Sequence, residues 1–205
     1  MVIGPVASTF APAKRRFCCF LLENLTYAML RLALTGPEST GKSTLSQQLA
    51  AYYGAPWVPE YARAYLAGRR PPYALADLEA IAHGQLSAEA AAEAAGGALL
   101  VCDTNLLVIK VWAEHAFGHC PAWIAAAVAQ PRYDLVLLLG VDVPWEPDPL
   151  REHPQLRQHF YDRYRDELRA GPDPFAEIWG PPAQRLAAAQ QLVDGLLRAA
   201  RPAVA

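Results

Sequence analysis

Residues 36–43 read GPESTGKS, and this stretch constrains the fold of the chain more than any other. It matches the pattern G-x-x-x-x-G-K-[ST], a phosphate-binding P-loop, which requires a strand before it and a helix after it. Apolar residues over 30–35 predict that strand. Leu45, Leu49 and Tyr52 recur at helical spacing and predict a helix over 43–53. The sequence therefore predicts a strand–loop–helix unit that binds a polyphosphate.

Two glycines explain how such a loop holds phosphate. Gly36 and Gly41 can adopt backbone angles that side chains disfavour, so successive N–H groups can turn inward around the anion. Lys42 is expected to reach the β- and γ-phosphates, and the Ser43 hydroxyl is expected to ligate Mg²⁺. Nucleotide contacts are predicted for Gly36, Glu38, Ser39, Thr40, Gly41, Lys42, Ser43 and Thr44.

Composition bounds the class of protein. The chain has 205 residues, of which 53% are hydrophobic and 19% charged, as in a single globular domain. A net charge of −2 argues against a general nucleic-acid binder, and no apolar run is long enough for a membrane span. The four cysteines lack metal-site spacing and predict reduced thiols in a cytoplasmic protein; they are Cys18, Cys19, Cys102 and Cys120.

The first 28 residues differ in character from the rest. A basic cluster over 14–16 and the apolar run after it faintly resemble a signal peptide, but Glu23 and Asn24 interrupt the run. We expect translation to begin at Met29, which leaves residues 1–28 as a disordered extension or a misassigned start. The expected folded domain is 29–205.

Apolar runs alternate with helical patterns along that domain. This alternation predicts an α/β fold of the P-loop NTPase class, with a doubly wound five-stranded parallel sheet and helices on both faces. The predicted strands are 30–35, 57–58, 98–103, 133–141 and 175–179. The predicted helices after the first are 61–66, 74–95, 104–117, 121–129, 155–170 and 182–200.

Carboxylates follow three of the predicted strands, where ligands bind in open parallel sheets. Asp103 ends the third strand and is a candidate Mg²⁺ ligand, directly or through water, and Glu60 after the second strand is the candidate catalytic base. A helix N-cap or a surface acid is the alternative for either residue. Arg63, one helical turn after Glu60, is expected to touch substrate or phosphate, or else to form a surface ion pair.

The proline-rich stretch over about 143–158 is predicted to be a lid. It carries Arg151 and Arg157, and arginines can neutralise charge on a transferring phosphoryl group. A solvated charged helix is the alternative. Trp145 is expected either to stack on a ring of the substrate or to anchor the lid.

Together these motifs resemble the NadR-type family of ribosylnicotinamide kinase domains. The matching pieces cover residues 29 to about 200 in order, and they are 36–43, Glu60–Arg63, His83–Gln85, Asp103–Thr104, Pro144–Trp145 and Leu150–Arg151. The resemblance implies a kinase that uses ATP and Mg²⁺ to phosphorylate the 5′-hydroxyl of a riboside, most simply nicotinamide riboside to its mononucleotide.

The resemblance also implies roles for single residues. Lys42 and Ser43 would hold phosphate and metal, Asp103 would lie beside the metal, and Arg151 and Arg157 would close over the phosphates. Residues 180–185 would lie near the adenine, which makes Arg185 a nucleotide contact. Substrate contacts are predicted for Glu60, Arg63, Gln85, Asn105 and Trp145.

Two departures from the family pattern concern the base of the acceptor. The family often has aromatic residues where this chain has Pro59 and Leu86, and such rings are expected to stack on the base. A kinase for another nucleoside or small alcohol is therefore one alternative, and an ATP-binding regulatory protein with little turnover is another. The sequence carries no signal for an oligomeric state.

Overall fold

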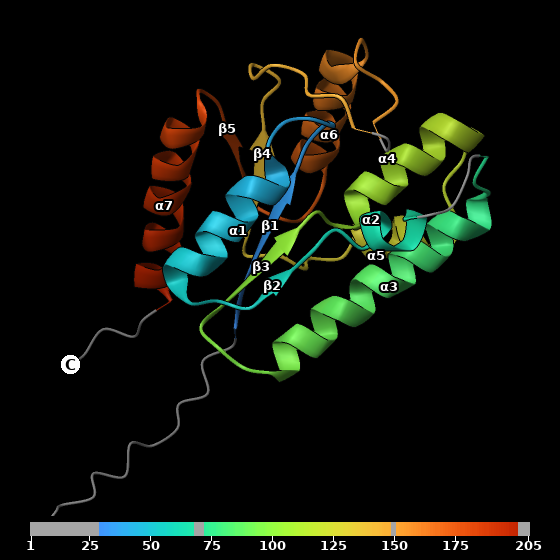
Figure 1. Ribbon diagram of the computed structural model, residues 1–205. Helices are drawn as coiled ribbons and strands as arrows, with labels where there is room; N and C mark the ends of the chain where they lie inside the picture. The colour runs from blue at the N-terminus through green and yellow to red at the C-terminus, as the bar shows by residue number, and fades with distance from the viewer. Residues whose placement is uncertain (1–28, 68–71, 149–150, 201–205) are drawn as a thin grey trace, which may run out of the picture.

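A computed structural model describes residues 29–67, 72–148 and 151–200 (Figure 1). The expectation for residues 1–28, and the family match at Leu150, lie outside the described residues. The described strands are β1 (Leu30–Thr35), β2 (Trp57–Val58), β3 (Leu99–Asp103), β4 (Leu135–Leu139) and β5 (Phe175–Ile178). The described helices are α1 (Lys42–Tyr53), α2 (Tyr61–Leu66), α3 (Leu75–Ala94), α4 (Leu106–Phe117), α5 (Ala122–Val128), α6 (Arg157–Ala170) and α7 (Pro182–Ala199).

The five strands form one parallel sheet in the order β2-β3-β1-β4-β5. Strand β1 is central, and its residue Leu34 pairs with Asp103 of β3, while Thr35 pairs with Leu138 of β4. Every residue of β3 is buried, which explains why its sequence is an unbroken apolar run rather than an alternating one. The predicted α/β fold with a five-stranded parallel sheet is confirmed.

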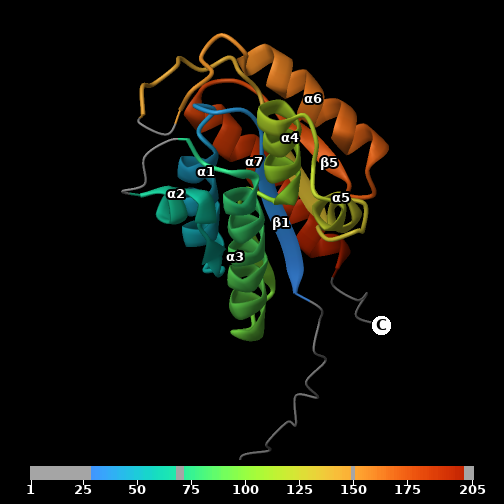
Figure 2. The ribbon, with the colours of Figure 1, turned by 90° about the vertical axis from the view of Figure 1, so that its right-hand side faces the viewer.

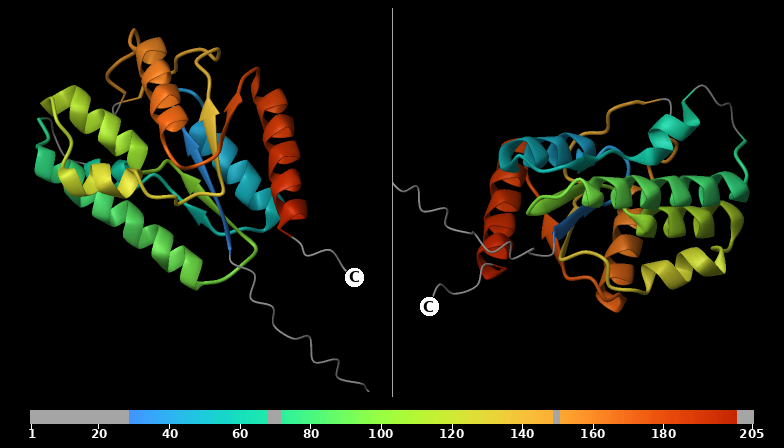
Figure 3. Two further views of the ribbon diagram at one scale, coloured as in Figure 1. Left: turned by 180° about the vertical axis from the view of Figure 1, so that it is seen from behind. Right: turned by 90° about the horizontal axis from the view of Figure 1, so that it is seen from below.

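Helices cover both faces of this sheet (Figures 2 and 3). Leu49 of α1 and Val193 of α7 are fully buried against one face, and Val111 of α4 and Tyr161 of α6 pack in the core on the other. A third apolar cluster joins α2, α3, α4 and α5 beyond the β2 edge of the sheet. The doubly wound arrangement leaves the carboxyl ends of the strands uncovered by helices, which is where a ligand can enter.

Element boundaries differ from the prediction where local backbone chemistry decides them. Helix α4 begins at Leu106 rather than at residue 104, because Thr104 adopts a left-handed φ of 88° and Asn105 is the extended N-cap residue. Strand β4 is shorter than predicted and β5 ends at Ile178. Among the described residues, no helix is both long enough and apolar enough to cross a bilayer.

Candidate active site

A cavity of about 1230 Å³ opens where the carboxyl end of β1 leads into the P-loop. Its walls come from the P-loop, α2, the start of α3, α4, and the described parts of the predicted lid. We call residues 143–148 and 151–158 the lid segment. The predicted site residues that line the cavity are Gly36, Glu38, Ser39, Thr40, Gly41, Lys42, Ser43, Thr44, Glu60, Arg63, Arg151 and Arg185.

The P-loop has the geometry that its glycines predict. Gly36 has a φ of 136°, and a Cβ there would lie 2.9 Å from the carbonyl oxygen of Leu139, so both conformation and space require glycine. Gly41 has a φ of 83° and caps helix α1. The Lys42 ammonium donates to the carbonyl oxygens of Gly36 and Pro37, each at 2.9 Å, which holds this cation inside the loop.

Charge at the P-loop is set by burial as well as by neighbours. Burial lowers the pKa of Lys42 from its ordinary value, while the nearby carboxylates of Glu60, Asp103 and Glu38 raise it.

Three arginines lie close to one another near the P-loop. Burial lowers the pKa of Arg157, and the charges of Arg185 and Arg151 lower it further. Mutual repulsion of these guanidinium groups would be relieved by a bound polyanion, as expected for a triphosphate site.

Asp103 lies deeper than the cavity wall. It is 1% exposed, and its Oδ1 atom is buried without a hydrogen-bond partner. Burial raises its pKa, whereas hydrogen bonding with Ser43 and the charge of Lys42 lower it. A hydroxyl and a carboxylate side by side are hard oxygen ligands, and Mg²⁺ is commonly held by one or two such groups together with substrate phosphates. Ser43 and Asp103 therefore fit the predicted metal.

Glu60 and Arg63 line the cavity at the start of α2. Glu60 is the N-cap residue of α2, and its Oε2 atom accepts a hydrogen bond from Arg63 Nε at 3.2 Å. The other end of the guanidinium reaches the lid segment, where Arg63 Nη1 donates to Asp148 Oδ2 at 3.1 Å. Both partners raise the pKa of Arg63 against the effect of burial. Arg63 therefore forms ion pairs with Glu60 and Asp148, and these pairs belong to the wall of the cavity.

The lid segment rests on the P-loop. Glu38 Oε2 accepts the backbone N–H groups of Glu152 and His153 at 3.1 and 3.2 Å. Ser39 Oγ accepts the N–H of Glu146 at 2.8 Å and a hydrogen bond from Arg151 at 3.3 Å. The side chain at position 38 of the P-loop thus contacts the lid segment as well as lining the cavity.

Arg157 and Trp145 lie behind the cavity wall rather than in it. Arg157 donates to the carbonyl oxygens of Ser39 and Val143, each at 3.0 Å, so it joins the P-loop to the start of the lid segment. Its guanidinium carbon lies 5.9 Å from the centre of the Trp145 ring. This contact lies within the lid segment, and the role of Trp145 stays a prediction.

Three further predicted residues are buried by the protein itself. Gln85 is 1% exposed, and its Oε1 atom accepts the N–H of Tyr61 at 3.0 Å, so it caps helix α2. Asn105 is 3% exposed and occupies the N-cap position of α4 outside this cavity, without a side-chain capping bond. Arg185 lines the cavity but is 3% exposed, and its guanidinium bonds to carbonyl oxygens of three loops. Gln85 and Asn105 do not line this cavity, so their predicted contacts with substrate stay predictions.

Two aromatic residues that sequence reasoning missed do line the cavity. Trp112 Nε1 donates to the Tyr73 hydroxyl at 2.9 Å, and the two ring centres are 4.8 Å apart at 76°. Val108, Trp112 and His115 all line the cavity, and their spacing of four and three residues puts them on one face of α4. That spacing is the sequence signal from which Trp112 could have been predicted to line the cavity. The aromatic surface that is absent at Pro59 and Leu86 is thus present on other elements.

Comparisons with known proteins agree with this geometry. The family AAA_28, described as an AAA domain, matches residues 31–185. The trifunctional NAD biosynthesis/regulator protein NadR of Escherichia coli (strain K12) is 30% identical over 124 residues, which cover 58% of this chain and 30% of that protein. The chain therefore spans about a third of the length of this curated relative.

Solved structures share the fold. NadR protein in complex with NR superposes with a TM-score of 0.73 at 21% identity, covering 87% of this chain and 54% of the other. NadR in complex with NAD and AMP-PNP gives 0.68 at 21% identity, covering 87% and 52%. Deoxyadenosine kinase from M. mycoides gives 0.53 at 13% identity, covering 82% and 100%.

Proposed function

Because the chain belongs to the AAA_28 family of AAA domains, we propose that its P-loop serves a kinase reaction: transfer of the γ-phosphoryl group of ATP, with Mg²⁺, to the 5′-hydroxyl of a riboside. Nicotinamide riboside is the first candidate acceptor. The observation that carries the proposal is that Lys42 of the P-loop and Glu60 before α2 line one cavity.

The chain's own groups divide the chemistry between them. The inward N–H groups of the P-loop, Lys42 and Arg151 would bind and neutralise the phosphates, and Mg²⁺ held near Ser43 and Asp103 would offset charge on the transferring group. Glu60 would accept the proton of the attacking hydroxyl as the new P–O bond forms and ADP departs. Because little covalent chemistry falls to the protein, most of the rate enhancement is expected from positioning and charge.

The choice of acceptor rests on the NadR likeness. A structure of NadR holds NR, and the curated NadR relative supports the same substrate class for this chain. A different nucleoside remains the second candidate, since Tyr73 and Trp112 line this cavity while Pro59 and Leu86 stand where the family often has aromatic residues. We also propose a cytoplasmic location, in keeping with the free thiols Cys102 and Cys120.

A substrate panel tests the proposal. Purified protein with ATP and Mg²⁺ is offered nicotinamide riboside, other ribonucleosides and deoxynucleosides, and small alcohols, and ADP release is followed with a coupled assay. We expect nicotinamide riboside to stimulate ADP release and to yield the mononucleotide, confirmed by mass spectrometry. Stimulation by another nucleoside alone would assign the second candidate. Tight ATP binding without stimulation by any acceptor would instead indicate the regulatory alternative.

A further inference from the structure

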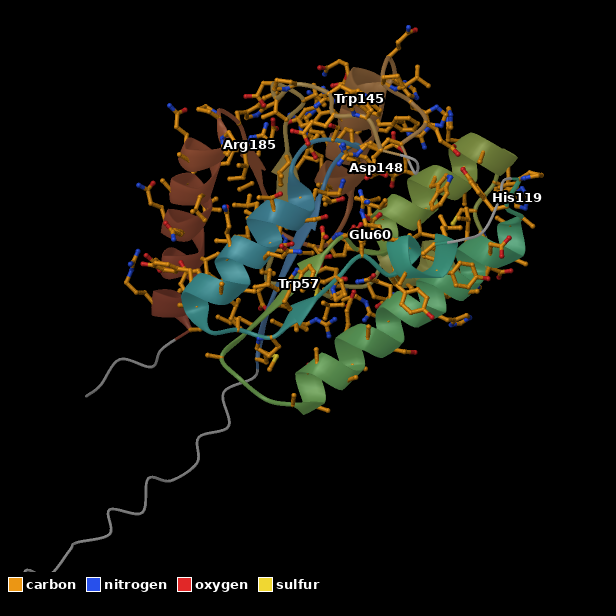
Figure 4. All side chains as sticks on the ribbon, viewed as in Figure 1. Trp57, Glu60, His119, Trp145, Asp148 and Arg185 are labelled. Carbon is orange, nitrogen blue, oxygen red and sulfur yellow. The ribbon has the colours of Figure 1, made fainter. Side chains whose placement is uncertain are left out.

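The lid segment contacts two parts of the cavity wall through one short stretch of chain. On the phosphate side, Glu38 accepts the N–H groups of Glu152 and His153. At the wall formed by α2 and the segment before α3, Asp148 accepts a hydrogen bond from Arg63 at 3.1 Å, and Glu152 accepts one from the Tyr73 hydroxyl at 3.0 Å. Figure 4 shows Asp148 above Glu60. The position of the lid segment is therefore linked to the P-loop and also to Arg63 and Tyr73.

An unbroken chain of charged contacts runs from the lid segment to the candidate base. Asp148 Oδ2 lies 3.1 Å from Arg63 Nη1, and Arg63 Nε lies 3.2 Å from Glu60 Oε2. The planar guanidinium presents its donors in a fixed fork, so an acceptor at one end also orients the donors at the other. A partly exposed ion pair three residues apart on a helix, like that of Arg63 with Glu60, is weak on its own. Asp148, as the second partner of Arg63, supplies the constraint on orientation that the Arg63–Glu60 pair lacks.

We propose that Arg63 and Asp148 are positioning residues that make the orientation of Glu60 depend on the docking of the lid segment. This inference rests on the kinase function proposed above. When the lid segment lies on the P-loop, Asp148 holds Arg63, and Arg63 holds Glu60 by its Oε2 atom. When the lid segment is displaced, Arg63 loses that partner and Glu60 loses its fixed orientation. Closure over the nucleotide would in this way prepare the base for the acceptor hydroxyl.

Hydrogen–deuterium exchange tests this link without knowledge of the acceptor. The full chain is compared with and without Mg²⁺ and a non-hydrolysable ATP analogue, and exchange is followed in peptides that contain residues 61–66 and in peptides that contain the P-loop. In the wild type, the analogue should slow exchange in both regions. In Asp148→Asn it should slow exchange in the P-loop alone. Retained slowing over 61–66 in this variant, or no slowing there in the wild type, would overturn the proposal.

Kinetics of a double-mutant cycle give an independent readout. Asp148→Asn keeps the size of the side chain and removes its charge, and Arg63→Gln removes the guanidinium. Each is expected to lower kcat about tenfold or more through misplacement of the base, while the KM for ATP stays within about twofold. The double variant should be no worse than Arg63→Gln, because both changes break one chain of contacts. Additive losses, or a raised KM for ATP with kcat unchanged, would contradict the proposal.

Asp166→Asn is the matched control. Asp166 is an exposed carboxylate on α6 that faces two arginines, Arg165 and Arg169, and it does not line the cavity. This variant should behave as wild type in both experiments.

The two proposals can fail separately. Should no riboside be phosphorylated while exchange over 61–66 still depends on Asp148, the proposed function fails and the link stands. Should ribosides be phosphorylated equally by wild type and Asp148→Asn, the link fails and the function stands.

Discussion

The Arg185 guanidinium donates a hydrogen bond to the carbonyl oxygen of Thr40 at 2.6 Å and so ties helix α7 to the P-loop. The same side chain donates to the carbonyl oxygens of Gly180 at 2.7 Å and Gly140 at 3.0 Å, and it pairs with Asp142. Three loops at the carboxyl edge of the sheet thus meet at one buried side chain. Its effect on nucleotide binding is expected to come from the shape of the P-loop.

Replacement of Arg185 by lysine should therefore weaken ATP binding. A single ammonium cannot span carbonyl groups on three loops, so we expect Arg185→Lys to raise the Kd for ATP about tenfold, as measured by calorimetry. Arg198→Lys, an exposed change on the same helix, serves as the control. An unaltered Kd in Arg185→Lys would show that the loop keeps its shape without this side chain.

Replacement of Lys42 by alanine separates chemistry from folding. Loss of the phosphate-binding cation should lower kcat by about 10³-fold. The fold should not suffer, because burial lowers the pKa of Lys42 and its charged form is therefore costly in the empty loop at neutral pH. We expect an unchanged or higher melting temperature by circular dichroism. Normal turnover in this variant would refute the role given to Lys42.

Asp103→Asn should lose activity and gain stability at neutral pH. Burial raises the pKa of Asp103 in the folded chain, so the folded state holds this proton more tightly than the unfolded state does. Its contribution to stability is therefore most favourable below the unfolded pKa of about 4 and declines as pH rises through the raised folded value. The stability advantage of Asp103→Asn over wild type should grow between about pH 4 and pH 7 in urea denaturation. An advantage that is constant with pH would contradict this account.

Gly84→Ala tests the packing that carries Glu60. A Cβ at Gly84 on α3 would lie 2.1 Å from Cε1 of Tyr61, the first residue of α2, so the ring or the helix must move. We expect kcat to fall about tenfold or more from displacement of the adjacent Glu60. Gly195→Ala on α7 is the control, since the added Cβ would lie 4.0 Å from Nη2 of Arg198 and alanine favours a helix over glycine by about 1 kcal/mol. Wild-type kcat in Gly84→Ala would show that α2 tolerates the shift.

Arg31→Leu tests a buried ion pair far from the catalytic groups. Arg31 lies 2.5 Å from Glu89, whose side chain is 1% exposed. Loss of the cation leaves a buried carboxylate, so the free energy of unfolding should fall by about 3 kcal/mol in urea titrations. Turnover at low temperature should be retained. The double variant Arg31→Leu/Glu89→Leu should lose less stability than the single one, and a larger loss in the double variant would contradict this explanation.

The sequence predicted the parts of the fold and site that have local signals. The P-loop could be predicted because its glycines, lysine and serine are contiguous, and the flanking strand and helix are periodic. Buried parallel strands such as β3 could be predicted because both faces are covered, which leaves a continuous apolar run. The ends of strands and helices were less predictable. A single residue with a positive φ, such as Thr104, sets where β3 ends and α4 begins.

The missed parts depend on which elements cross in space. Gln85 caps α2 because α3 passes beside it, and a polar residue in a long helix gives no sign of that contact. Tyr73 and Trp112 come from separate segments and form one wall only after α4 packs on α3. Arg185 is similar, because its carbonyl partners lie on three loops far apart in the sequence. Side chains of this kind are placed by tertiary structure.

The central place of β1 has a consequence for biosynthesis. Both of its neighbours, β3 and β4, follow it in the chain by more than sixty residues, since the pairing partners of Leu32 are Val101 and Leu135. A ribosome that has just released the phosphate loop has therefore made a strand with two open edges. Strand β1 cannot complete its pairing until β4 has been synthesised. The nascent chain must therefore avoid pairing with wrong strands until then.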